Sequence, residues 1–254
     1  MHQPTVRVLE ILELVTQKRD GMRLSDISRI LSIPKGTLLP ILKTLCEYRY
    51  LLRNENGEYM GGAALLSFGN LFSDNYPILS IVRSELRDMS EKFGETYYFG
   101  ILDSGNVLYL EKVESIQPLR MLINTGRRLP AYATGIGKSL LIDKTQAELD
   151  DLYPQGLIPL TKNTVTSISE LSRQLSEARE LGYAYEVEES MEHIRCFSVP
   201  IRKHGEVVAA ISVAIPIFRY EDGAKERIIE MLKEKAEKLG SLIEKTNVNL
   251  ENLF

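Results

Sequence analysis

The sequence contains no tryptophan, only two cysteines and only three histidines among its 254 residues. Cys46 and Cys196 are too far apart to give a disulfide framework. His193 and Cys196 have zinc-ligand spacing, but no second pair completes a site. The longest nearly apolar run, residues 207–218, is shorter than the roughly 20 residues that a membrane-spanning helix needs. The N-terminus lacks the apolar core of a secretory signal. We therefore expect a cytoplasmic protein without membrane, metal or cofactor.

Charge is unevenly distributed along the chain. The formal net charge is −4, which argues against a protein that coats nucleic acid along its whole length. Residues 1–60 contain nine Lys/Arg and seven Asp/Glu, whereas the remainder contains 22 and 28. A slightly positive N-terminal segment on an acidic body permits a small nucleic-acid-binding module without requiring one.

The first 60 residues predict three helices and a β-hairpin. Apolar residues recur at helical spacing over residues 8–15, 27–31 and 38–45, and we expect Ser25 to cap the second helix. Asn56-Gly57 lies between two extended runs and favours a hairpin, because both residues tolerate positive φ. This order is typical of a winged helix-turn-helix, whose third helix enters the DNA major groove. A three-helix bundle without nucleic acid fits this pattern about as well.

The rest of the chain predicts a helical connector and a second domain. Residues 61–93 are helical in pattern, which implies a defined spacing between domains. We then expect strands at 96–103, 107–113, 119–123, 183–187, 194–202 and 207–217, and helices at 137–142, 146–153, 169–181 and 221–245. Strands joined by hairpins, with helices inserted, indicate an α+β domain with a mainly antiparallel sheet.

The segment from Gly135 to Ser139 is similar to the end of a phosphate-binding P-loop. A P-loop needs glycine where Tyr132 stands, and no apolar strand leads into this segment, so we do not expect nucleotide hydrolysis. Glycines at a helix start leave free N–H groups that favour an anion, such as a ligand carboxylate, or that are simply capped.

No catalytic set is complete. Cys196 lies in an expected strand, where a small buried residue is the better interpretation than a nucleophile. We expect Glu186, Glu188 and Glu189 to form a solvated edge at a strand end unless one of them turns inward. We therefore expect no enzymatic activity, although an enzyme using Cys196 or the Lys138 loop is a rival interpretation.

The order of these elements, together with several short strings, resembles the IclR family of bacterial transcriptional regulators over residues 6–242. The strings are residues 24–28, 33–37, 94–96, 126–138, 182–184, 188–189 and 195–196, with Pro200 and Gly205. Each string alone is weak, but their order and spacing make the match specific.

The resemblance implies three parts. They are a winged helix-turn-helix DNA-binding domain (1–62), a helical linker with the first helix of the effector domain (63–93), and a GAF-like effector-binding domain (94–254). It also implies a homodimer or homotetramer that binds a double-stranded DNA operator and senses a small organic acid or related metabolite, as a repressor. The alternative function is a small-molecule sensor or interaction module whose sequence-specific DNA binding is weak or lost.

For DNA binding, the resemblance implies contacts from the third helix and from the region of the wing. The candidate residues are Lys35, Gly36, Thr37, Lys43, Arg49 and Arg53. Gly36 stands where the family usually has serine, and Pro40 where arginine is common. A helix that starts at Pro34 places Pro40 in its interior, at a cost of about 3 kcal/mol if unrelieved. If Thr37 instead caps a later start, Pro40 falls in the first turn.

For effector binding, the resemblance implies a pocket in the C-terminal domain. The candidate residues are Gly135 and Ile136, through their N–H groups, with Glu186, Cys196 and Ser212. Glu186 falls where the family commonly has aspartate, and Ala214 where it often has a second serine. These departures suggest a pocket somewhat less polar than that of a small keto-acid sensor.

Overall fold

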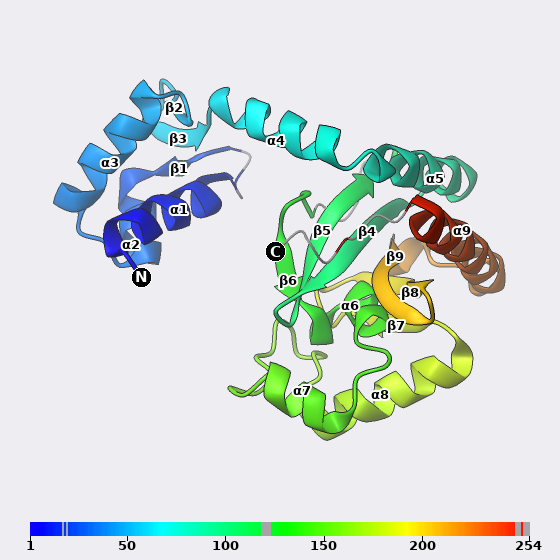
Figure 1. Cartoon of the computed structure of the whole chain (residues 1–254). Coiled ribbons are helices and arrows are strands. Elements are labelled where there is room, and N and C mark those ends of the chain that lie inside the picture. The colour runs from blue at the N-terminus through cyan, green and yellow to red at the C-terminus, as the bar shows by residue number, and fades with distance from the viewer. Residues whose placement is uncertain (17, 19, 118–122, 247–249, 251–254) are drawn as a thin grey trace. The chain divides into compact units, whose positions relative to one another are not determined.

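The computed structural model describes the whole chain except residues 17, 19, 118–122, 247–249 and 251–254 (Figure 1). Contacts among the described residues group into two compact units, Met1–Pro77 and Ile78–Phe254. The boundary falls within the helical connector expected at residues 63–93, so the first helix of that connector belongs to the first unit and the second helix to the second unit.

The first unit is a winged helix-turn-helix followed by a long helix. Its elements are α1 (Gln3–Thr16), β1 (Met22–Arg23), α2 (Leu24–Leu31), α3 (Lys35–Glu47), β2 (Leu51–Arg53), β3 (Glu58–Gly61) and α4 (Ala64–Asn75). The three strands pair antiparallel in the order β1-β3-β2. The expected apolar positions meet in one core, which includes Ile11, Ile27, Leu38 and Leu42. The hairpin signal at Asn56-Gly57 is confirmed as the turn between β2 and β3.

The start of α2 differs from the expectation. Ser25 does not cap this helix, because the helix begins at Leu24 with Arg23 in the N-cap position. Met22 and Arg23 pair with Tyr59 and Glu58 of the wing, so the chain passes directly from a short strand into the helix. A strand of two residues has no detectable alternation, and the sequence pattern therefore missed β1.

Pro40 lies in the interior of α3. Pro34 occupies the N-cap position, and its carbonyl accepts the N–H groups of Thr37 and Leu38 at 2.9 and 3.0 Å. Thr37 therefore does not cap a later helix start. Pro40 has no N–H to donate to the Gly36 carbonyl one turn earlier, so α3 lacks one of its regular hydrogen bonds.

The second unit is built on a six-stranded antiparallel sheet, in agreement with the expected α+β class. Its strands are β4 (Thr96–Asp103), β5 (Asn106–Val113), β6 (Arg128–Pro130), β7 (Ala184–Val187), β8 (Ile194–Lys203) and β9 (Glu206–Pro216), in the order β6-β5-β4-β9-β8-β7. Its helices are α5 (Ile78–Phe93), α6 (Gly135–Leu140), α7 (Gln146–Leu152), α8 (Ile168–Leu181) and α9 (Lys225–Thr246). Residues 119–122 of the strand expected at 119–123 lie outside the described residues.

Helices cover the sheet of the second unit on both sides. Figure 1 shows α5 and α9 together on one side, and α6 on the other side against the middle strands. α8 packs on β7 and on α6. Buried apolar side chains of β4, β5, β8 and β9 meet those of α6 in one core, which includes Tyr98, Ile136 and Cys196. None of the helices that the structure describes is long and apolar enough to cross a membrane.

Candidate functional sites

The first candidate site is the exposed face of α3. Leu38, Leu42 and Leu45 are buried in the first unit, so the opposite side of the helix faces outward. Lys35, Gly36, Thr37 and Lys43, which the resemblance proposes as DNA contacts, are all exposed. Among the described residues, neither Lys35 nor Lys43 has an ion-pair partner within 4.0 Å. Both ammonium groups are therefore available to phosphates.

The two arginines near the wing differ in their surroundings. Arg49 is exposed and has a φ of 62°, a left-handed conformation just after α3. Its carbonyl accepts the N–H of Ala64, and a Cβ on Gly62 would lie 2.2 Å from that carbonyl oxygen. Only glycine allows this close approach between the end of α3 and the chain that leads into α4. Arg53 is also exposed, but its guanidinium lies 5.7 Å from the ring centre of Tyr59 in the wing.

The second candidate site lies on the sheet face that α6 covers. Cys196 pairs with Glu186 on one side and with Ala214 on the other, so these three residues form one row across β7, β8 and β9. Ser198 and Ser212 pair in the next row, and Ser212 also pairs with Tyr98 of β4. The structure thus brings the expected Glu186, Cys196 and Ser212 together, although they come from three strands.

Gly135 and Ile136 begin the helix that faces these rows. A Cβ on Gly135 would lie 3.0 Å from the Cβ of Cys196, so the start of α6 rests directly on the sheet. The Thr134 hydroxyl accepts the N–H of Gly137 at 3.0 Å and caps the helix. Gly137 allows a second close approach, because a Cβ there would lie 2.1 Å from the Ala131 carbonyl oxygen.

Glu186 is completely buried, so it is the inward-turning glutamate that the expectation of a solvated edge allowed as an exception. Its carboxyl oxygens accept the N–H of Glu189 at 2.8 Å and the hydroxyl of Ser190 at 2.9 Å. Burial raises the pKa of Glu186 above its ordinary value, although these hydrogen bonds and one from the Cys196 thiol act in the opposite direction. The carboxyl group therefore holds the turn after β7 as well as facing the sheet rows.

Cys196 is a buried thiol rather than a nucleophile. Burial raises its pKa well above the ordinary value, and the neighbouring Glu186 carboxyl raises it further. A neutral thiol of this kind can donate a weak hydrogen bond, but it is not a reactive thiolate.

Lys138 and Glu189 form a buried ion pair that the sequence analysis did not identify. Lys138 Nζ lies 2.5 Å from Glu189 Oε1, and the two side chains are 3% and 10% exposed. The pair joins α6 to the turn after β7. Thr164 donates its hydroxyl to the Glu189 carbonyl at 2.6 Å, which holds the same turn from a third segment.

Tyr98, Tyr109 and Ser198 are further residues of this face that the sequence analysis did not single out. The rings of Tyr98 and Tyr109 meet edge to face at 5.4 Å, and both are buried. The Ser198 hydroxyl is buried and has no hydrogen-bond partner in the part of the chain that the structure describes. The alternation within β8 and β9 was the available signal, since Cys196 and Ser198 must face the same side.

Comparisons with known proteins match both units. The model of the bacterial transcriptional regulator IclR C-terminal domain matches residues 72–241, and that of the IclR helix-turn-helix domain matches residues 4–55. The HTH-type transcriptional regulator XynR of Escherichia coli is 33% identical over 235 residues, which are 91% of this chain and 93% of that protein. The transcriptional repressor IclR of Escherichia coli is 28% identical over 225 residues, 87% of this chain and 82% of that protein. The crystal structure of the Thermotoga maritima IclR superposes with a TM-score of 0.73 at 28% identity, covering 96% of this chain and all of that one.

Proposed function

Because this chain belongs to the IclR family of bacterial transcriptional regulators, we propose that it represses transcription as a homodimer or homotetramer and that a small organic acid or related metabolite controls its affinity for the operator. As a member of this family it is a DNA-binding regulator with an effector-binding C-terminal domain, not an enzyme. Residues 1–62 bind DNA in this proposal, residues 63–93 link the parts, and residues 94–254 bind the effector.

The observation that carries the proposal is the exposure of Lys35 and Lys43 on α3, where neither ammonium group has an ion-pair partner among the described residues. These ammonium groups contact phosphates of the operator, while Gly36 and Thr37 approach the bases. Arg49 and Arg53 contact phosphates beside the wing. Basic side chains that neutralise phosphates release counterions, so the affinity for DNA depends on salt.

The test is a salt series of operator binding by the full chain. Replacing both lysines, Lys35→Ala with Lys43→Ala, is expected to weaken binding and to reduce the slope of log K against log salt by about 0.9 per lost contact. The control is Lys162→Ala with Lys245→Ala, two exposed lysines of the second unit, which removes the same charge. An unchanged slope in the α3 variant would contradict the phosphate contacts. Absence of any specific complex would favour the alternative function, a small-molecule sensor.

The effector is proposed to bind beside the start of α6, on the sheet face that this helix covers. Gly135 and Ile136 offer N–H groups there, and Glu186, Cys196 and Ser212 supply the opposite wall. Ala214 contributes a methyl group where a serine would contribute a donor, which supports an effector less polar than a small keto acid.

Isothermal titration of the full chain with pyruvate and with longer monocarboxylic and hydroxy acids tests this site. We expect the longer acids to bind more tightly than pyruvate, and Ser212→Ala to weaken their binding by about three- to tenfold, the effect of one hydrogen bond of about 1 kcal/mol. Ser241→Ala, at an exposed position of α9, is the matched control. Tightest binding of pyruvate would contradict the less polar pocket.

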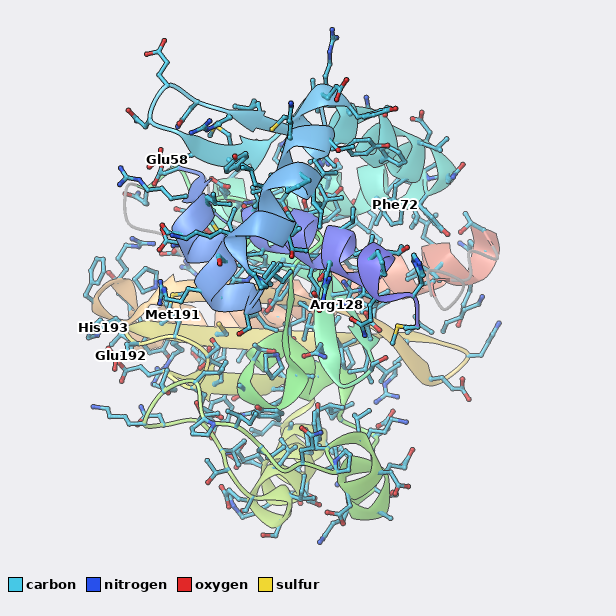
Figure 2. The ribbon with its side chains drawn as sticks, turned by 90° about the vertical axis from the view of Figure 1, so that its left-hand side faces the viewer. Glu58, Phe72, Arg128, Met191, Glu192 and His193 are labelled. Carbon is cyan, nitrogen blue, oxygen red and sulfur yellow. The ribbon has the colours of Figure 1, made fainter. Side chains whose placement is uncertain are left out.

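The oligomer is proposed to form through α4. No residue of this helix is buried, and Phe68, Leu71 and Phe72 lie on one side of it with exposures of 57%, 61% and 38%. Phe72 lies at the surface of the unit (Figure 2). Exposed apolar stripes of this kind mark interaction surfaces. In a dimer bound to an operator with two-fold symmetry, the α4 helix of a second copy covers this apolar stripe.

Analytical ultracentrifugation of Leu71→Glu tests this interface. A charge placed in the apolar stripe is expected to shift the protein towards monomer. Asn70→Glu adds the same charge on the other side of α4 and is expected to leave the oligomer intact. If both variants sediment like the wild type, α4 does not hold the copies together.

A further inference from the structure

The outward face of α3 has an unusual composition for a helix that reads DNA. The residues opposite its buried leucines are Gly36, Pro40, Lys43 and Glu47, with the half-exposed Leu39 beside them. α3 contains no arginine, asparagine, glutamine or histidine. Arginine makes the commonest bidentate contact with guanine, and asparagine or glutamine makes the corresponding contact with adenine. The middle of this face therefore carries apolar atoms where hydrogen-bond donors are usual.

The protein itself gives no packing reason for Gly36 or Pro40. Among the described residues, and apart from the backbone of α3 itself, no atom would lie within 4 Å of a Cβ on Gly36, so a larger residue would fit. Pro40 is exposed, and it removes a helix hydrogen bond without burying its ring in the core. The Thr44 hydroxyl, one turn further along α3, donates to the Pro40 carbonyl at 3.0 Å and is therefore engaged within the helix. Residues that disfavour the local helix, and whose cost no packing within the protein offsets, are expected where the protein contacts a partner.

Resting on the proposed function, the geometry points to apolar readout of the operator: Leu39 and Pro40 contact the C5-methyl groups of thymines in the major groove. Thymine is the base that presents a methyl group in this groove, and apolar side chains recognise it. The absent side chain of Gly36 lets the helix approach the base edges closely, so that the proline ring reaches the methyl. Each half-site then contains at least one thymine opposite the middle of α3. Lys43 contacts a phosphate and contributes no base preference.

The experiment begins with selection of binding sites by the full chain from a pool of random DNA duplexes. Each thymine of the selected half-site is then replaced by uracil, which removes only the methyl group. We expect at least one position where uracil weakens binding about fourfold, the effect of withdrawing one buried methyl from apolar contact. The salt slope is expected to stay unchanged on the uracil duplex, because no charge is lost.

Two variants assign the methyl contact to its side chains. In Leu39→Ala and in Pro40→Ala, the ratio of affinities for thymine and uracil duplexes is expected to shrink towards one at the position that each side chain contacts. Both residues are exposed, and alanine restores the helix hydrogen bond at position 40, so both variants are expected to fold. Lys43→Ala is the contrasting control. It is expected to weaken binding to both duplexes equally and to lower the salt slope by about 0.9.

The outcomes separate this inference from the function on which it rests. If selection enriches no sequence, the operator-binding function fails, and the inference fails with it. If selection enriches a site but no uracil substitution weakens binding, the protein is an operator-binding regulator that reads bases by another route, and the inference alone is overturned. An undiminished thymine preference in both Leu39→Ala and Pro40→Ala would also overturn it.

Discussion

At the residue scale, the carboxyl group of Glu186 combines complete burial with hydrogen bonds from two segments. It accepts from the Glu189 N–H and from the Ser190 hydroxyl, and the Cys196 thiol donates to it as well. Burial disfavours the charged form more than these donors favour it, so the pKa is raised. A buried acid with a raised pKa makes the stability of the fold depend on pH.

Glu186→Gln is expected to remove that pH dependence. Because the pKa is higher in the folded state, the contribution of Glu186 to stability is fully present below the ordinary glutamate pKa of 4.5 and declines as pH rises through the raised value. The wild type should therefore lose stability relative to the variant as pH rises above about 4.5. Urea unfolding followed by circular dichroism measures this difference. Glu192→Gln, at an exposed glutamate of the next turn, should track the wild type, and a constant difference for Glu186→Gln would contradict the prediction.

Lys138→Met is expected to destabilise the second unit strongly. The substitution leaves Glu189 buried without its cation, which typically costs about 3–5 kcal/mol. Arg173→Ala removes one partner of the exposed pair with Glu170 and should have little effect on stability, because water screens such a pair. Unfolding midpoints of the two variants, measured side by side, check the contrast. Similar small losses would mean that water reaches Glu189 easily.

Part of the candidate effector site, on the sheet face that α6 covers, was predicted from the sequence. The family resemblance implied that Cys196 and Ser212 belong to the pocket. The strand pairing of β8 with β9 then places both on one face of the sheet, because side chains alternate along a strand. The Lys138–Glu189 pair joins residues that are far apart in the chain, so no local pattern reports it. The burial of Glu186 depends on α6 and on the turn after β7, and a run of three nearby glutamates suggested solvent instead.

At the element scale, helices and hairpins with strong local signals were predicted well. The capping box of Thr145 and Glu148 and the left-handed Gly182 fix the ends of α7 and α8 where the pattern placed them. The start of α2 was wrong, because a tertiary strand pairing at Met22 overrides the capping preference of Ser25. For α3 the sequence allowed two helix starts, and the structure has the one that places Pro40 in the interior.

Pro40→Ala is expected to stabilise the first unit. Alanine supplies the N–H that proline lacks and relieves its clash with the preceding turn, for a gain of up to about 3 kcal/mol. Pro34→Ala changes a residue in the N-cap position, where no helix hydrogen bond is missing, and should give no such gain. Thermal unfolding of both variants measures the difference. Equal effects would mean that α3 has already adjusted to the proline.

At the scale of the whole molecule, the regulator must couple effector binding in the second unit to operator binding in the first unit. α4 ends at Asn75 and α5 begins at Ile78, so only Tyr76 and Pro77 separate a helix of the first unit from a helix of the second. The sequence placed the start of the effector domain near Thr96, where the pattern changes from helical to β-rich. The contact boundary lies earlier, since α5 packs on β4 and β5 of the second unit.

Effector binding is expected to change operator affinity by about 5- to 150-fold, the usual range of allosteric coupling. Coupling of binding free energies is reciprocal, so the operator must change the effector affinity by the same factor. Titration of the bound and free protein with the effector, beside operator titrations with and without it, measures both factors. Ser212→Ala should bind the operator normally in the absence of effector. Unequal factors would mean that a further state, such as a change of oligomer, takes part.

Insertion of two glycines between Tyr76 and Pro77 is expected to uncouple the two events. Each unit has its own core, so operator binding and effector binding should both persist, while the coupling factor falls towards one because a flexible joint transmits no defined displacement. The same insertion after Gly156, in an exposed turn of the second unit, is the control and should preserve coupling. If the protein with the glycines at Tyr76 still releases its operator on effector binding, the signal does not depend on the short connection. It would then have to pass through another contact, such as a rearrangement of the oligomer itself.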